Sequence, residues 1–163
     1  MNLYEKLLQQ GFEEGLIIKE KPLFSDIKGL CKGNKIALNT NKLDTSIEKR
    51  CILAEEIWHS KLTVGDITDT TNTSNLKQER LARVQAIKDL APLDKIVQGL
   101  LNDCNNIYEL ADYLEVTEEF LHEAFEYYIQ KYGDKYYCAE YTLSFSPVFI
   151  IGSAITPQGD EFL

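Results

Sequence analysis

Residues 46–60 carry an apolar stripe with helical spacing. The stripe consists of Ile47, Cys51, Ala54 and Trp58, and it is widened by Leu53 and Ile57. Because positions three and four apart share one face of an α-helix, this spacing predicts a helix that is largely buried. The same helix contains charged side chains, and a carboxylate in a buried helix needs a partner.

Three charged side chains of this helix are spaced to act together. Glu55 and His59 are four positions apart and therefore share a face, while Glu56 lies one step round the helix. This is the H-E-x-x-H arrangement of metallopeptidases with glutamate in the first place. The spacing predicts that Glu55 and His59 bind one metal ion and that Glu56 holds a water beside it.

Two further blocks flank the helix. Residues 35–39 (Lys-Ile-Ala-Leu-Asn) form a short apolar strand before it, and residues 77–86 (Lys-Gln-Glu-Arg-Leu-Ala-Arg-Val-Gln-Ala) form a helix after it, followed by Leu-Ala-Pro. In this order, residues 25–131 resemble the ImmA/IrrE family of metallopeptidases, in a branch from mobile elements of Gram-positive bacteria that carries Glu-Glu in place of His-Glu. Trp58 stands where that family usually has glycine, and Arg83 where it usually has asparagine.

The resemblance implies a function. The protein would be a zinc-dependent, endopeptidase-like antirepressor of a mobile genetic element, and its substrate would be a helix-turn-helix repressor protein. Glu55, His59 and Glu79 would bind the ion, and Glu56 would be the general base and later the proton donor. Two carboxylates and one imidazole are a harder donor set than two histidines, so manganese or weak zinc occupancy is the alternative.

Two other interpretations remain open. In the simpler one, Glu55 and Glu56 lie on solvent-facing turns, His59 is a helix-end histidine, and Glu79 is one of the 26 acidic residues of the chain. In the other, the protein is an inactive pseudo-peptidase that binds a regulator protein through its acidic surface. Trp58 and the missing first histidine motivate this second alternative.

Composition limits the class of protein. With 163 residues, of which 44% are hydrophobic, the chain can form a packed core. A net charge of -9 argues against direct binding of nucleic acid. The four cysteines are scattered and are expected to be reduced, mostly buried thiols. The N-terminus does not resemble a signal peptide and no apolar run is long enough to span a membrane, so a cytoplasmic location is expected.

The expected fold class is α+β and mainly helical. Residues 1–92 would form a zincin-like core, in which a small β-hairpin or sheet packs on the two active-site helices. Within it the sequence predicts a helix over residues 2–11, a β-prone run at 15–19, a hairpin turn at 32–34 and a flexible loop at 63–75. The next helix would begin at Leu76, capped by Ser74 or Asn75.

The remaining chain divides into two parts. Residues 93–133 are predicted to form an acidic, helix-turn-helix-like bundle with helices over 93–102, 107–114 and 118–132. No lysine or arginine occurs between Lys95 and Lys131, so the bundle is expected to bind a partner protein and not DNA. A DNA reader would need a basic surface built from residues 19–50 and 77–95.

Residues 134–163 form a β-prone arm, with runs at 136–145 and 148–151. Such an arm can pack on its own domain or pair with a second copy, which makes it a candidate surface for a homo-oligomer.

Overall fold

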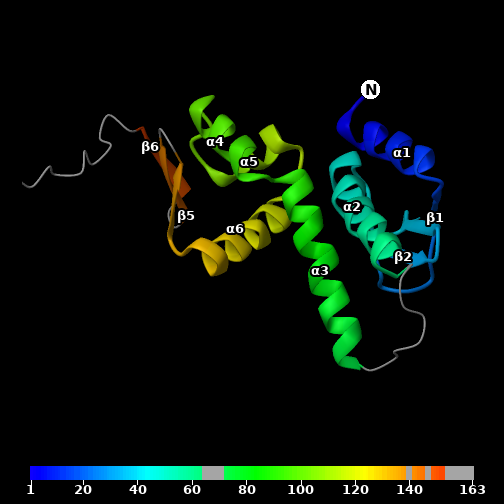
Figure 1. The fold of residues 1–163 in the computed structure, drawn as a ribbon. Helices are drawn as coiled ribbons and strands as arrows, with labels where there is room; N and C mark the ends of the chain where they lie inside the picture. Colours follow the sequence, from blue (N-terminus) through cyan, green and yellow to red (C-terminus); the bar gives the residue numbers. More distant parts are fainter. Residues whose placement is uncertain (64–71, 139–140, 146–147, 153–163) are drawn as a thin grey trace, which may run out of the picture.

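The computed structural model describes residues 1–63, 72–138, 141–145 and 148–152. Within these residues the protein is α+β and mainly helical, with six helices and two three-stranded sheets (Figure 1). None of the helices in these stretches combines the length and apolar character needed to cross a bilayer. The coarse fold class expected from the sequence is therefore confirmed.

The first sheet lies in the N-terminal part together with α1 (Leu3–Glu13). Its strand order is β1-β3-β2: β1 (Ile17–Lys21) runs parallel to β3 (Lys35–Asn39), and β2 (Gly29–Lys32) runs antiparallel to β3. The hairpin predicted at residues 32–34 is confirmed, since β2 and β3 meet at a turn where Gly33 has a φ of 62°. One edge of β2 has no neighbouring strand in its sheet.

The buried amide of Asn39 holds the segment that leads into β2. Asn39 is 0% exposed, and its Nδ2 donates to the backbone oxygens of Ser25 at 3.2 Å and Ile27 at 2.8 Å. Its Oδ1 accepts from the backbone nitrogen of Leu23 at 3.0 Å. Because all these bonds go to backbone groups, one side chain fixes the path of residues 23–27.

The helix α2 (Ser46–Thr63) is buried from two sides, as its apolar stripe predicts. Leu53 and Ile57 belong to a core shared with α1 and the first sheet, whereas Cys51 and Ala54 belong to the core of the helical part. Figure 1 shows α2 between the first sheet and α3. The division into residues 1–92, 93–133 and 134–163 stays a prediction.

Four helices follow α2 in the described chain: α3 (Asn72–Leu90), α4 (Leu93–Leu101), α5 (Ile107–Leu114) and α6 (Glu118–Tyr132). The three bundle helices are confirmed almost residue for residue, with Asn106 and Thr117 as side-chain N-caps of the last two. The predicted start of the preceding helix is wrong, because α3 already includes Ser74 and Asn75. Residues 64–71 of the predicted loop lie outside the described residues.

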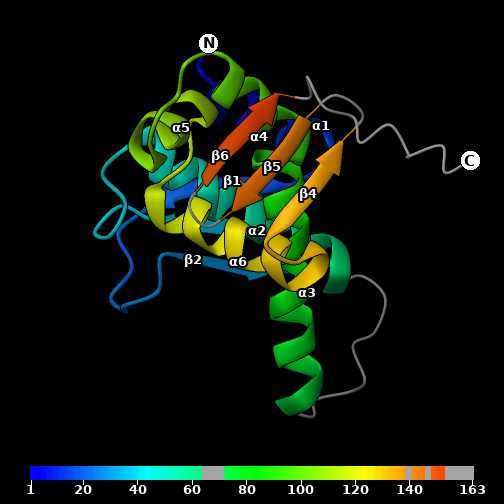
Figure 2. The same cartoon turned by 90° about the vertical axis from the view of Figure 1, so that its left-hand side faces the viewer.

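The second sheet is antiparallel, with the order β4-β5-β6 (Figure 2). The run at 136–145 divides into two strands, β4 (Lys135–Cys138) and β5 (Tyr141–Phe145), and β6 (Val148–Gly152) follows. Leu143 and Phe145 are buried, and the ring of Phe145 stacks on Tyr128 of α6 with centroids 6.0 Å apart. The described strands of the arm therefore pack on their own helical core. Self-association through the arm stays a prediction.

Candidate functional site

The four predicted site residues line one pocket at the junction of the first sheet, α2 and α3. The pocket has a volume of about 470 Å³. Its wall is formed by Ile27, Gly29, Leu30, Cys31, Glu55, Glu56, His59, Asn75, Gln78 and Glu79. Residues 24 positions apart in the sequence thus meet because α2 and α3 pack side by side. Trp58 does not belong to this wall.

The contact between His59 and Glu79 joins the two helices at the pocket. Nε2 of His59 lies 3.2 Å from Oε2 of Glu79. The imidazole is mostly covered, with 17% of the side chain exposed, whereas the carboxylate is 69% exposed. Glu79 therefore reaches the histidine from the solvent side of the pocket.

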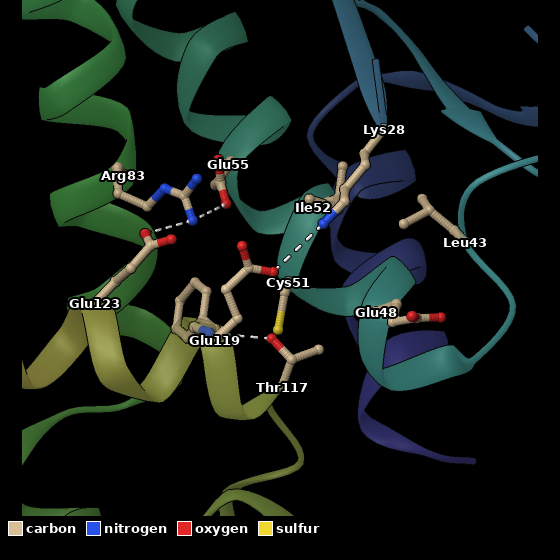
Figure 3. A pocket seen from close by; sticks show the side chains of 11 residues that line it. Lys28, Leu43, Glu48, Cys51, Ile52, Glu55, Arg83, Thr117, Glu119 and Glu123 are labelled. Atoms are coloured by element: carbon tan, nitrogen blue, oxygen red, sulfur yellow. Dashed lines mark hydrogen bonds and ion pairs between the residues drawn. The ribbon is translucent and has the colours of Figure 1, made fainter. Parts of the chain in front are cut away.

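Glu55 faces a guanidinium group. Its Oε1 lies 2.9 Å from Nη1 of Arg83, and the same nitrogen lies 2.8 Å from Oε2 of Glu123 on α6. Figure 3 shows Arg83 between the two carboxylates. All three side chains line a second pocket, which has a volume of about 210 Å³. Arg83 and Glu55 are close enough to form an ion pair, but the N–H group of Arg83 does not point at the oxygen as a hydrogen bond requires. The buried Oε1 of Glu55 therefore has no hydrogen-bond partner among the described residues.

Glu56 is held against the backbone of β2. A Cβ atom at Gly29 would come within 2.7 Å of Oε1 and 2.9 Å of Cγ of Glu56, and within 2.6 Å of Ile52. Only glycine therefore allows β2 to approach α2 this closely. The approach places the Glu56 carboxyl group directly against the face of β2 that is turned toward α2.

Burial changes the acidity of both glutamates. Burial is the largest cause that raises the pKa of Glu55 to about 7, where Arg83 acts in the opposite direction and Glu123 and Glu79 add to the rise. Burial also raises the pKa of Glu56 to about 7, helped by the negative charges of Glu55 and Glu79. A carboxyl group with a pKa near neutrality can both accept and return a proton at neutral pH.

Trp58 points away from the pocket. Its Nε1 donates to Oδ2 of Asp89 on α3 at 2.6 Å, and Nζ of Lys61 lies 4.8 Å from the ring centroid. The indole lines a different hollow, next to α1. The bulky residue at this position therefore does not fill the pocket that contains His59.

The donor types suit a divalent cation, although the ligand set is not assembled. Among the described residues, no group of three or more His, Cys, Asp or Glu side chains surrounds a common point, since Glu55 pairs with Arg83 while His59 contacts Glu79. The buried Oε1 of Glu55 makes no hydrogen bond in the described part of the chain, and the cation that it faces is the guanidinium of Arg83 at 2.9 Å. A buried carboxylate oxygen without a hydrogen bond is costly, and a metal ion that displaced Arg83 would relieve that cost.

Several contributing residues were not predicted from the sequence. Gly29 and Asn39 shape the β2 side of the pocket, but their roles depend on packing and leave no local pattern. Glu123 was expected only as one acid of the bundle surface, and its contact with Arg83 spans 40 positions. Among the cysteines, Cys51 is buried, whereas Cys31, Cys104 and Cys138 are half-buried and all four are free thiols.

The chain matches no protein-family model, and no curated protein matches it either.

Proposed function

We propose that the protein is a metal-dependent, endopeptidase-like antirepressor with a zincin-like core, which acts on a helix-turn-helix repressor of a mobile genetic element. The observation that carries the proposal is the pocket in which Glu55, Glu56 and His59 of α2 meet Glu79 of α3. Four residues singled out by one motif and one resemblance line the same pocket. Four surface residues without a common role would not be expected to line one pocket.

Each of these residues has a distinct part in the proposal. Glu55, His59 and Glu79 would hold zinc, with manganese as the alternative ion. When bound, such an ion supplies Lewis-acid chemistry, making a water more acidic and a carbonyl group more electrophilic. Glu56 would take the proton of the attacking water and pass it to the leaving amine. Its carboxyl group lies against β2, an edge strand of the first sheet, and an extended substrate chain would pair with the open edge of that strand.

The nature of the substrate rests on the resemblance and on charge. The acidic residues of α5 and α6 include Asp112, Glu118 and Glu126, which are exposed. A repressor that binds DNA presents a basic surface, which these acids would attract. They would bring the repressor to the protein without contributing to the chemistry.

Metal content tests the site directly. In untagged protein, elemental analysis is expected to find about one ion per chain. His59→Ala should lower the occupancy at least tenfold, because the loss of a ligand exceeds the roughly tenfold cost of losing an outer-shell partner. The matched control is His122→Ala, which removes the only other histidine, exposed on α6. Equal metal content in all three proteins would contradict the proposed ligand set.

A second candidate is an inactive pseudo-peptidase that binds the repressor without cutting it. The ion pair between Arg83 and Glu55 favours it, because a guanidinium already neutralises the carboxylate that a metal would need. Reversing Asp112 and Glu126 to lysine should then weaken repressor binding about tenfold at low salt. The control reverses Glu13 and Asp44, which are exposed in the N-terminal part. Equal binding by both variants would exclude the acidic surface as the docking face.

A further inference from the structure

The outer face of the first sheet gathers four lysines. Lys19 and Lys21 lie on β1, Lys35 on β3 and Lys32 on β2, and all four are exposed. The register explains the grouping. Lys32 pairs with Lys35, and Lys19 pairs with Ala37, whereas their neighbours Ile18 and Ile36 point into the core. The four side chains therefore emerge on the side of the sheet that faces away from the core.

The lysines surround an apolar hollow. Ile17 on β1 is 44% exposed and Leu30 on β2 is 49% exposed; Leu30 pairs with Ala37 of the central strand, and Ile17 pairs with Lys35 beside it. The hollow has a volume of about 450 Å³. Its lining is Ile17, Lys19, Lys21, Leu30, Lys32, Lys35, Ile36 and Ala37. We call this surface the basic face.

The positive charge of the basic face is not neutralised within the described chain. Glu20 is the only acidic residue in the three strands, and it points to the opposite side, where it accepts from Tyr4 and pairs with Lys49 at 2.7 Å. In the described part of the protein, none of the four lysines forms an ion pair. A chain with a net charge of -9 thus concentrates free positive charge on one sheet face.

The basic face continues into the candidate site. Leu30 lines both the hollow of the basic face and the pocket that contains Glu56. It lies on β2, one of the two edge strands of this sheet. A chain that lies across the basic face can therefore pass round the edge of β2 toward the pocket.

We propose that the basic face docks an acidic, amphipathic segment of a partner protein. An apolar side chain of the segment fills the hollow around Ile17 and Leu30, and neighbouring carboxylates pair with the lysines. Nucleic acid fits this face less well. The lining contains no aromatic side chain on which a base could stack and no arginine to grip a phosphate in two places, and the centre of the face is apolar.

Fluorescence anisotropy with a short labelled peptide of alternating glutamate and leucine tests the proposal. The wild type is expected to bind the peptide saturably, and Lys19→Glu with Lys32→Glu should weaken binding at least tenfold. The control variant carries Lys88→Glu and Lys95→Glu, which change the net charge equally on exposed positions of α3 and α4. It should bind like the wild type. Circular dichroism shows whether each variant is folded.

Further ligands tested in the same assay distinguish an acidic, amphipathic peptide from other possible ligands of the basic face. A peptide with serine in place of leucine should bind much more weakly, because the hollow then stays unfilled. The proposal is overturned if the wild type fails to bind the leucine peptide, if the serine peptide binds equally well, or if a single-stranded oligonucleotide or anionic vesicle binds the face more tightly. Glu56→Gln should bind the peptide like the wild type, so the result does not depend on the proposed catalysis.

Discussion

The Glu56→Gln variant is expected to cleave a purified helix-turn-helix repressor about 10²–10⁴ times more slowly than the wild type, the usual contribution of a positioned proton-transfer group. Glutamine keeps the shape of the side chain beside Gly29 but cannot accept a proton. The measurement is the rate at which a discrete repressor fragment forms in the presence of zinc or manganese. Metal content should not change, because Glu56 is not among the proposed ligands.

The matched control is Glu126→Gln, which removes an exposed carboxylate on α6 and should leave the rate unchanged. Fragments formed equally fast by wild type and Glu56→Gln would contradict catalysis by this residue. Tight, salt-sensitive association of the wild type with the repressor, without any fragment, would instead support the inactive alternative. The two outcomes distinguish the candidate functions in one experiment.

Glu56→Gln is expected to lower the activity of the protein but to raise its stability. In metal-free protein the folded state holds the Glu56 proton up to a pKa of about 7, whereas an ordinary glutamate loses it near 4.5. The unfolded state therefore binds fewer protons between these values, and the wild type loses stability as the pH rises through this range. Glu56→Gln, which carries no charge, should be more stable than the wild type at pH 8 and differ less at pH 4. A variant that is inactive but well folded is thus recognised by its unfolding curve.

Much of the fold could be predicted from the sequence because local patterns determine it. The apolar stripe of α2 identifies a buried helix, and Gly33 identifies the turn between β2 and β3. The start of α3 could not be placed in this way. Several residues before Leu76 can cap a helix, and nothing in the local sequence distinguishes Ser74 from the earlier position at which α3 begins. The split of the run at 136–145 into β4 and β5 was missed because both strands are β-prone.

The candidate site was predicted in its members but not in its contacts. The spacing of Glu55 and His59 on one helix face is a local property and can be read from the sequence. The pairing of Glu55 with Arg83, and of Arg83 with Glu123, depends on how α2, α3 and α6 pack. The direction of Trp58 depends on Asp89, which lies 31 positions away. Sequence patterns identify candidate ligands, but tertiary packing decides which charge each of them faces.

Arg50 is the clearest case of a structural role that no local pattern reveals. It is only 6% exposed, and its Nη1 donates to the backbone oxygens of Leu114 at 2.8 Å and Glu115 at 2.6 Å. These carbonyls lie at the C-terminus of α5, where a helix lacks internal donors and carries partial negative charge. A side chain of α2, the helix that both cores share, thereby caps a helix 64 positions later in the chain.

Arg50→Met is therefore expected to lower the free energy of unfolding by about 2–4 kcal/mol, because it keeps the apolar bulk but leaves one buried and one partly buried carbonyl group without a charged donor. Arg50→Lys should recover part of the loss. The measurement is denaturant unfolding followed by the fluorescence of Trp58, the single tryptophan, which lies on the same helix. Lys42→Met, which removes only an exposed ion pair with Asp26, is the control and should leave the free energy of unfolding nearly unchanged. Equal stability of Arg50→Met and Lys42→Met would contradict the capping role.

Because α2 contributes to both cores, the loss of stability in Arg50→Met should appear as a shift of one cooperative unfolding transition. A second transition confined to the helical part would show that the two cores unfold independently.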